Sequence, residues 1–137
     1  LDLFREFTVA DYYFMKSLVF ASSTLQGEEY NLYRQIFYII YCSLPKPDIY
    51  VYLHLKPESL LENIRKRGRE YEKSITKEYL QKIQDSYFAF FKQNPGNKYL
   101  VIDINNLDFV ANEKHYAKII NCIFGNACTD GLNMVIL

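Results

Sequence analysis

Two short segments, residues 48–55 and 98–104, constrain the fold more than any other feature of the sequence. Both are rich in β-branched and aromatic residues and are apolar at successive positions, not only at alternate ones. Such segments are typical of parallel strands whose two faces are both covered by helices. A sheet usually has about 5–6 strands. Two strands therefore indicate either that this chain pairs with another, or that strands of the domain lie outside this sequence.

The residues around these two segments predict helices. Apolar side chains recur there at three- to four-residue spacing, and Pro57 and Thr76 are typical of helix starts. The predicted helices cover residues 9–41, with a break near Gly27, and then 58–66, 76–91 and 112–124. Strands that alternate with helices favour an α/β fold with a parallel sheet. The many Tyr and Phe residues on these helices are interpreted first as core packing.

Charge and cysteine content exclude several classes of protein. Lys plus Arg and Asp plus Glu each number 16, so the formal net charge is zero and a broad basic surface for nucleic acid is not expected. No run of about 18 apolar residues predicts a membrane-spanning helix, and residues 1–5 do not resemble a signal peptide. Three dispersed cysteines and two histidines show no metal-ligand spacing, so we expect no metal site and a reducing cytoplasm.

The sharpest local feature is a cluster of cations from Arg65 to Arg69, interrupted by Gly68. Arginine suits a phosphate oxyanion because its planar guanidinium offers two donors and a permanent charge. Gly68 allows the chain to turn, so that Arg67 and Arg69 can converge. The alternative is a solvated helix C-terminus whose cations complement the helix dipole.

The segment around these arginines resembles the lid of the deoxynucleoside kinase family. These are P-loop enzymes that phosphorylate the 5′-hydroxyl of deoxynucleosides. The lid match runs from Asn63 to Glu72 and continues through 75–80. Other matches follow in the family's order, at Val19–Ser22, Glu29–Tyr33, Pro47–Leu53 and Asp103–Phe109. The resemblance covers roughly residues 9–124.

This resemblance implies a three-layer P-loop kinase-type fold, with a parallel sheet flanked by helices. Residues 1–124 would form the C-terminal portion of the kinase domain, with a lid at about 65–75. Residues 125–137 lie beyond the match and would be an extension or foreign sequence. The implied reactants are ATP with Mg²⁺ and a deoxynucleoside, and the implied assembly is a homodimer through helices of the first third.

Carried over position by position, the resemblance also implies roles for single residues. Arg67 and Arg69 match the catalytic lid arginines that close on the phosphates, and Arg65 stands one helical step from another lid arginine of some members. Glu72 matches the glutamate that accepts a hydrogen bond from the sugar 3′-hydroxyl. Its alternative is a surface partner for a neighbouring cation, Lys73 or Arg69.

The loop Asp108-Phe109 matches the segment that cradles the base of ATP. The alternative for Asp108 is a cap of the turn before the last helix. Asp11 occupies the slot of the family's acidic-Arg-Ser motif, but the flanking residues are Ala10 and Tyr12 and the arginine is missing. We expect Asp11 to do polar work near the substrate.

The phosphate-binding loop itself is not in this sequence. A P-loop has the pattern G-x-x-x-x-G-K-[ST], and none of the 5 glycines precedes Lys and Ser or Thr. The family's general-base glutamate is absent with it, so we expect this chain alone to be inactive and ATP and Mg²⁺ to be held mainly by residues outside it. Two other interpretations stay open: a nucleotide kinase similar to thymidylate kinase, and a non-catalytic helical interaction module.

Overall fold

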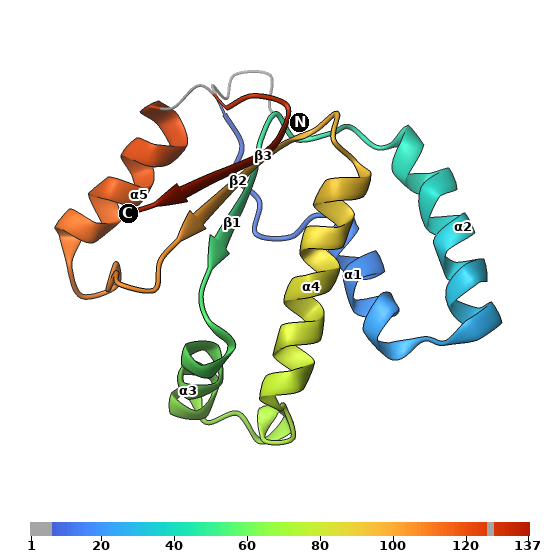
Figure 1. Ribbon diagram of the computed structural model, residues 1–137, viewed down its shortest axis with the longest axis horizontal. Helices are drawn as coiled ribbons and strands as arrows, with labels where there is room; N and C mark the ends of the chain where they lie inside the picture. The colour runs from blue at the N-terminus through green and yellow to red at the C-terminus, as the bar shows by residue number, and fades with distance from the viewer. Residues whose placement is uncertain (1–6, 126–127) are drawn as a thin grey trace. The chain divides into compact units, whose positions relative to one another are not determined.

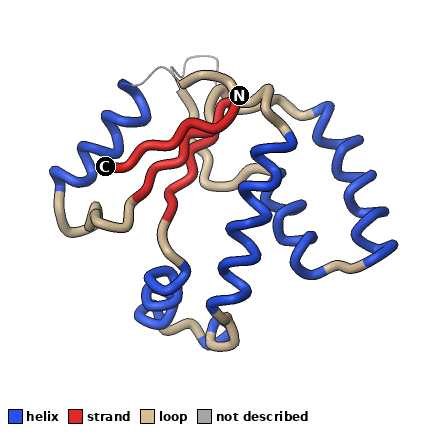
Figure 2. Tube along the Cα trace, viewed as in Figure 1, coloured by secondary structure: helices blue, strands red, loops and turns tan. Residues whose placement is uncertain are grey.

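The computed structural model describes residues 7–125 and 128–137. The chain divides into two compact units, Leu1–Leu44 and Pro45–Leu137. Figure 1 labels the elements, and Figure 2 shows that helices dominate the first unit while the strands belong to the second. In the described ranges no helix is both long and apolar enough to cross a membrane.

The first unit is a pair of helices, α1 (Met15–Thr24) and α2 (Gly27–Ser43). The predicted break near Gly27 is confirmed, and it lies at Leu25 and Gln26. Gly27 is the first residue of α2, and its φ of 54° is a left-handed conformation that glycine adopts without strain. The two helices are joined by aromatic packing. Phe14 stacks on Phe37 with ring centroids 4.9 Å apart, and Phe37 stacks in turn on Tyr41 at 5.2 Å.

The second unit is built on a parallel sheet of three strands in the order β1-β2-β3. The strands are β1 (Tyr50–His54), β2 (Lys98–Asp103) and β3 (Gly131–Ile136). Residue Tyr50 pairs with Tyr99 and His54 with Asp103, so β1 and β2 end at the same edge of the sheet. The predicted parallel sheet and its first two strands are confirmed. The carboxyl ends of parallel strands are where α/β proteins commonly bind ligands.

Helices cover both faces of this sheet and produce three layers. The covering helices are α4 (Lys77–Gln93) and α5 (Glu113–Gly125). Helix α3 (Pro57–Arg67) follows β1 and packs against α4, and a short 3-10 helix η1 (Glu70–Glu72) lies between α3 and α4. On one face, Phe91 of α4 stacks on Tyr99 with ring centroids 4.4 Å apart. Helix α5 lies on the other face (Figure 1). There Ile119 and Cys122 of α5 are buried against Leu100 and Ile102 of β2. Because β2 is covered on both faces, its side chains are apolar at successive positions.

Strand β3 differs from the expectation that residues 125–137 lie outside the domain. Gly131–Ile136 pairs in parallel with the whole of β2 and begins where the N–H of Gly131 donates to the carbonyl of Asn97 at 2.8 Å. Alternate residues of β3 are exposed, among them Met134 at 61%. This alternation is the pattern of a strand with one covered face. The strand was not predicted because its segment has only six residues and lies beyond the family resemblance.

Candidate functional site

The segment predicted to be a lid, residues 65–75, makes a sharp reversal of the chain between α3 and α4, and we call this segment the lid. Helix α3 ends at Gly68, whose φ of 71° lies in the left-handed region and whose N–H donates to the carbonyl of Ile64 at 3.2 Å. The turn that glycine allows directs the chain away from the helix axis. Residues Glu70–Glu72 then form η1, and α4 starts at its predicted cap, where the Thr76 hydroxyl accepts a hydrogen bond from the N–H of Tyr79 at 3.2 Å.

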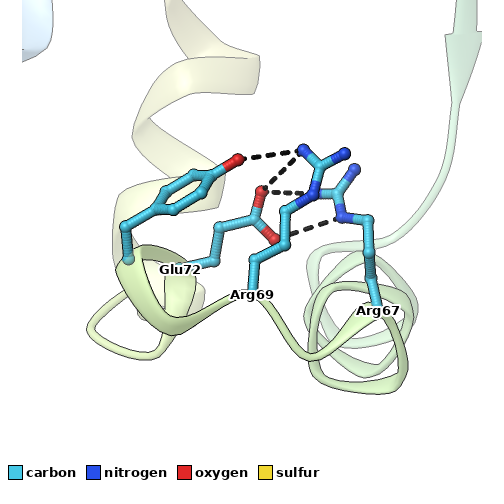
Figure 3. A network of polar contacts seen from close by, with 4 residues as sticks. Arg67, Arg69 and Glu72 are labelled. Carbon is cyan, nitrogen blue, oxygen red and sulfur yellow. Dashed lines mark hydrogen bonds and ion pairs between the residues drawn. The ribbon is translucent and has the colours of Figure 1, made fainter.

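Two arginines on either side of this turn converge on one carboxylate (Figure 3). Arg67 binds Glu72 with two bonds, from Nη2 to Oε1 at 2.7 Å and from Nε to Oε2 at 3.1 Å. Arg69 places Nη1 at 3.6 Å from Oε1 of Glu72 and donates to the hydroxyl of Tyr71 at 3.0 Å. The predicted convergence of Arg67 and Arg69 is therefore confirmed.

The side chains of Glu72, Arg67 and Arg69 differ in how far they are buried. The Glu72 side chain is only 9% exposed, whereas those of Arg67 and Arg69 are about half exposed, at 49% and 51%. A buried carboxylate requires charged partners, and the two arginines supply them. Lys73 pairs with Glu70 at 2.6 Å and not with Glu72. Arg69, the other partner that the alternative interpretation named, does pair with Glu72, but this carboxylate is buried rather than on the surface. The exposed guanidinium edges remain accessible to an anion from solvent.

A small open pocket of about 190 Å³ lies against the same turn. Its wall combines apolar side chains from α3 and the lid with charged groups, namely Leu61, Ile64, Arg65, Gly68, Arg69, Glu72, Lys73 and Ile75. Arg65 therefore belongs to the same group of residues as Arg69 and Glu72. With Arg67, and with the Glu70 that pairs with Lys73, four cations accompany two carboxylates at this turn. The remaining surplus of positive charge suits a phosphate group.

Asp108 and Phe109 lie in the connection between β2 and α5. The Asp108 carboxylate accepts from the N–H of Ala111 at 3.0 Å, and its backbone N–H donates to Nδ1 of His115 at 3.0 Å. Phe109 is half-buried and packs against the apolar cluster beneath α5. Asp108 thus caps a turn, as its alternative interpretation states, and the role of the loop toward ATP stays a prediction. His115 is half-buried and holds this loop.

Asp11 and His54 are two further residues that the sequence brings into question, and each is described within its own unit. Asp11 belongs to the first unit, is exposed, and accepts a bond on its backbone carbonyl from Nζ of Lys16 at 2.5 Å. His54 of β1 packs edge-on against Phe88 of α4 with ring centroids 6.0 Å apart, so it is a packed strand residue. No group of three His, Cys, Asp or Glu side chains that could hold a metal ion occurs among the described residues.

Substitutions at Gly68 are expected to separate backbone strain from steric conflict. A Cβ at this position would meet no atom within 4 Å, so only the left-handed conformation opposes a side chain. A left-handed β-branched residue is costly, whereas Asn tolerates this conformation. We expect Gly68→Val to lower the melting temperature and Gly68→Asn to stay close to the parent. Equal melting temperatures for the two variants would show that the turn does not require a left-handed residue.

Comparison with known proteins agrees with this fold. The sequence model of the deoxynucleoside kinase family matches residues 4–129. The chain is 33% identical over 115 residues to a deoxyguanosine kinase of Bacillus subtilis (strain 168), which is 81% of this chain and 56% of that protein. It is 34% identical over 93 residues to a deoxyadenosine kinase of Dictyostelium discoideum, which is 68% of this chain and 38% of that protein.

A three-layer α/β fold with an arginine-rich lid is the class that these observations define. The chain belongs to the deoxynucleoside kinase family. It spans about half the length of the curated relatives it matches. Strand β3 lies wholly beyond the residues that the family model matches.

Proposed function

We propose that this chain is the C-terminal part of a deoxynucleoside kinase domain, with its lid at residues 65–75, that phosphorylates the 5′-hydroxyl of a deoxynucleoside with ATP. The observation that carries the proposal is the convergence of Arg67 and Arg69 on the buried Glu72 in a chain of this family. In phosphoryl transfer the protein contributes mainly positioning and electrostatic stabilisation. Half-exposed arginines held by a buried carboxylate suit that task.

Each lid residue has a separate role in the proposal. Arg67 and Arg69 stabilise the charge that builds up on the transferring phosphoryl group, and Arg65 contacts the phosphates of ATP. Glu72 accepts a hydrogen bond from the sugar 3′-hydroxyl. A carboxylate has about four lone-pair sites, and Arg67 donates one bond to each oxygen, so acceptor sites remain. The described residues offer no metal cluster, and we assign Mg²⁺ to none of them.

Outside the lid, we propose that Asp108 and Phe109 contact the base of ATP and that Asp11 contributes to substrate binding. The acceptor is a purine deoxynucleoside, because the relatives that the chain resembles are named deoxyguanosine and deoxyadenosine kinases. We place the activity in the cytoplasm. The sequence has three dispersed cysteines, at 42, 122 and 128, and no C-x-x-C spacing, which supports a reducing compartment.

The first unit supports a homodimer as the working form. Helix α2 carries exposed apolar side chains along one face, at Leu32, Ile36, Ile39 and Ile40, and Ile39 is 75% exposed. Apolar stripes of this kind mark protein–protein contacts. We expect Ile39→Arg to convert the whole protein from dimer to monomer in light scattering, while Asn31→Arg, outside the stripe on the same helix, remains a dimer. A parent protein that is monomeric at tens of micromolar would contradict the homodimer.

Substitution of Glu72 tests its role toward the sugar. Glu72→Gln keeps the shape of the side chain but weakens its acceptor strength toward a hydroxyl. We expect kcat/KM to fall roughly tenfold for deoxynucleosides with a 3′-hydroxyl and much less for their 3′-deoxy analogues. Steady-state kinetics on matched pairs of analogues measures this ratio. Equal losses for both members of a pair would argue that Glu72 serves only the arginines.

The sequence of the complete reading frame tests the proposed function as a whole. We expect G-x-x-x-x-G-K-[ST] to occur after a strand upstream of residue 1, because backbone N–H groups of that loop and its lysine would hold the phosphates of ATP. A complete frame without this pattern would favour a non-catalytic interaction module.

A further inference from the structure

Among the residues that the structure describes, the buried polar or charged side chains are Glu72 and Gln84. Glu72 holds the tip of the lid, whereas Gln84 lies in α4 and is only 5% exposed. Nε2 of Gln84 donates to the backbone carbonyl of Leu55 at 2.6 Å. Gln84 also bonds the hydroxyl of Tyr52, whose pKa is raised to about 12 by burial and by Tyr87, against the opposing effect of this bond. Leu55 lies in the short link between β1 and α3, so this buried amide holds the backbone directly before α3. We call this link, Leu55 and Lys56, the root of the lid helix.

A second amide holds the next residue of the same link. Oδ1 of Asn105 accepts the N–H of Lys56 at 2.9 Å. Asn105 is fixed in turn by Asp103, whose Oδ1 accepts from the backbone N–H of Asn105 at 2.9 Å and from its Nδ2 at 2.8 Å. The backbone N–H of Asn105 is the main reason why the pKa of Asp103 lies below its ordinary value. Asp103 is therefore ionised at neutral pH and orients the amide.

These two bonds take the place of a local cap at the start of α3. Lys56 is the N-cap residue and makes no side-chain cap bond, and Pro57 at the first helical position has no N–H. The carbonyl of Leu55 and the N–H of Lys56 belong to the same peptide group. Gln84 of α4 binds the carbonyl, and Asn105, which follows β2, binds the N–H. The start of the lid helix is thus fixed by residues 29 and 49 positions away in the sequence.

Because α3 is long, a small rotation at its start produces a large displacement at its end. Eleven residues of α-helix span roughly 16 Å, so a rotation of about 10° at Lys56 would displace the end of the helix by about 3 Å. Arg67, the last residue of α3, binds Glu72 through two bonds that tolerate no such shift. A misplacement of about 1 Å can reduce catalysis substantially.

We propose that Gln84 and Asn105 are positioning residues that fix the root of the lid helix and thereby place Arg67. Asn105 also opens the connection that carries Asp108, so it joins the lid to the loop given to the base of ATP. The kinetic part of this inference rests on the proposed function. Its structural part does not.

Limited proteolysis of the whole protein tests the structural part. Trypsin cleaves after arginines of the lid, and a loosened lid is cut faster. We expect Asn105→Ala and Gln84→Met to raise the cleavage rate after Arg67 and Arg69 by about fivefold. Gln81→Met is the matched control, because Gln81 lies one turn earlier on α4, is exposed, and bonds Asp85 instead. Far-ultraviolet circular dichroism of each variant establishes that it is folded.

Kinetics distinguish a positioning role from a general loss of structure. We expect Asn105→Ala to lower kcat about threefold to tenfold, with the KM for the deoxynucleoside unchanged. In an Arg67→Ala background the same substitution should have no further effect, because its target is already removed. Folded variants with parental cleavage rates would overturn the inference. So would a kcat loss of equal size in both backgrounds. A protein without transferase activity would contradict the proposed function, and the proteolysis would still decide the inference.

Discussion

Arg67→Ala is expected to lower the kcat of the whole protein by roughly 10²- to 10³-fold, the usual loss for removing one charge-stabilising donor from a transition state. The KM for the deoxynucleoside should change little, because this charge acts on the transferring phosphoryl group. Arg67→Lys should recover only part of the loss, since one ammonium cannot reproduce the two bonds at 2.7 and 3.1 Å to Glu72. Steady-state kinetics with varied ATP and deoxynucleoside measures both parameters.

The matched control for Arg67 is Lys66→Ala on the same helix. Lys66 lies next to Arg67 in the cation cluster, but its side chain is 69% exposed and pairs with Glu62 at 2.8 Å, one turn earlier on α3, rather than with Glu72. We expect its kcat to stay within about twofold of the parent, because exposed ion pairs contribute little. In Arg67→Ala the buried carboxylate of Glu72 loses its main partner. A second variant, Arg67→Ala with Glu72→Gln, removes this uncompensated charge as well. Parental turnover in Arg67→Ala would refute the lid assignment.

Phe91→Ala is expected to lower the free energy of unfolding by about 3–5 kcal/mol, the usual cost of deleting a buried aromatic ring. Phe91 belongs to α4, is 2% exposed, and packs against the sheet. Its ring stacks on Tyr99 at 4.4 Å and packs edge-on against Tyr52 at 5.8 Å. Chemical denaturation of the whole protein, followed by circular dichroism, measures the difference.

Phe124→Ala provides the control for this substitution. Phe124 lies in the last turn of α5 and is 63% exposed, so the same change in chemistry removes little buried surface. We expect a loss of less than about 1 kcal/mol. Equal losses at the two positions would contradict the packing of α4 on the sheet.

Local signals explain what could be predicted from the sequence. The strands β1 and β2 are apolar at successive positions because helices cover both faces, and that pattern is visible in one dimension. Gly68, Arg67 and Glu72 lie within five positions of one another, so their convergence follows from a single turn that glycine permits. The predicted cap at Thr76 depends on the N–H three residues later.

The remaining features depend on contacts that sequence patterns do not encode. Gln84 and Asn105 bind backbone groups 29 and 49 positions away, and a backbone carbonyl or N–H leaves no signature in the sequence. His115 accepts the N–H of Asp108 only because the loop folds back on α5. Strand β3 is short and half-exposed, and its pairing with β2 arises from the sheet rather than from its own six residues.

Transfer of labelled phosphate is the most direct test of the proposed activity. The whole protein is incubated with ATP labelled at the γ-phosphate and with deoxyadenosine, deoxyguanosine or their 5′-monophosphates, and the products are separated by chromatography. We predict label in the 5′-monophosphate of a purine deoxynucleoside, and none in a diphosphate. Label that appears only in a diphosphate would identify a nucleotide kinase, and a folded, complete protein that transfers no label to any deoxynucleoside would contradict the proposed function.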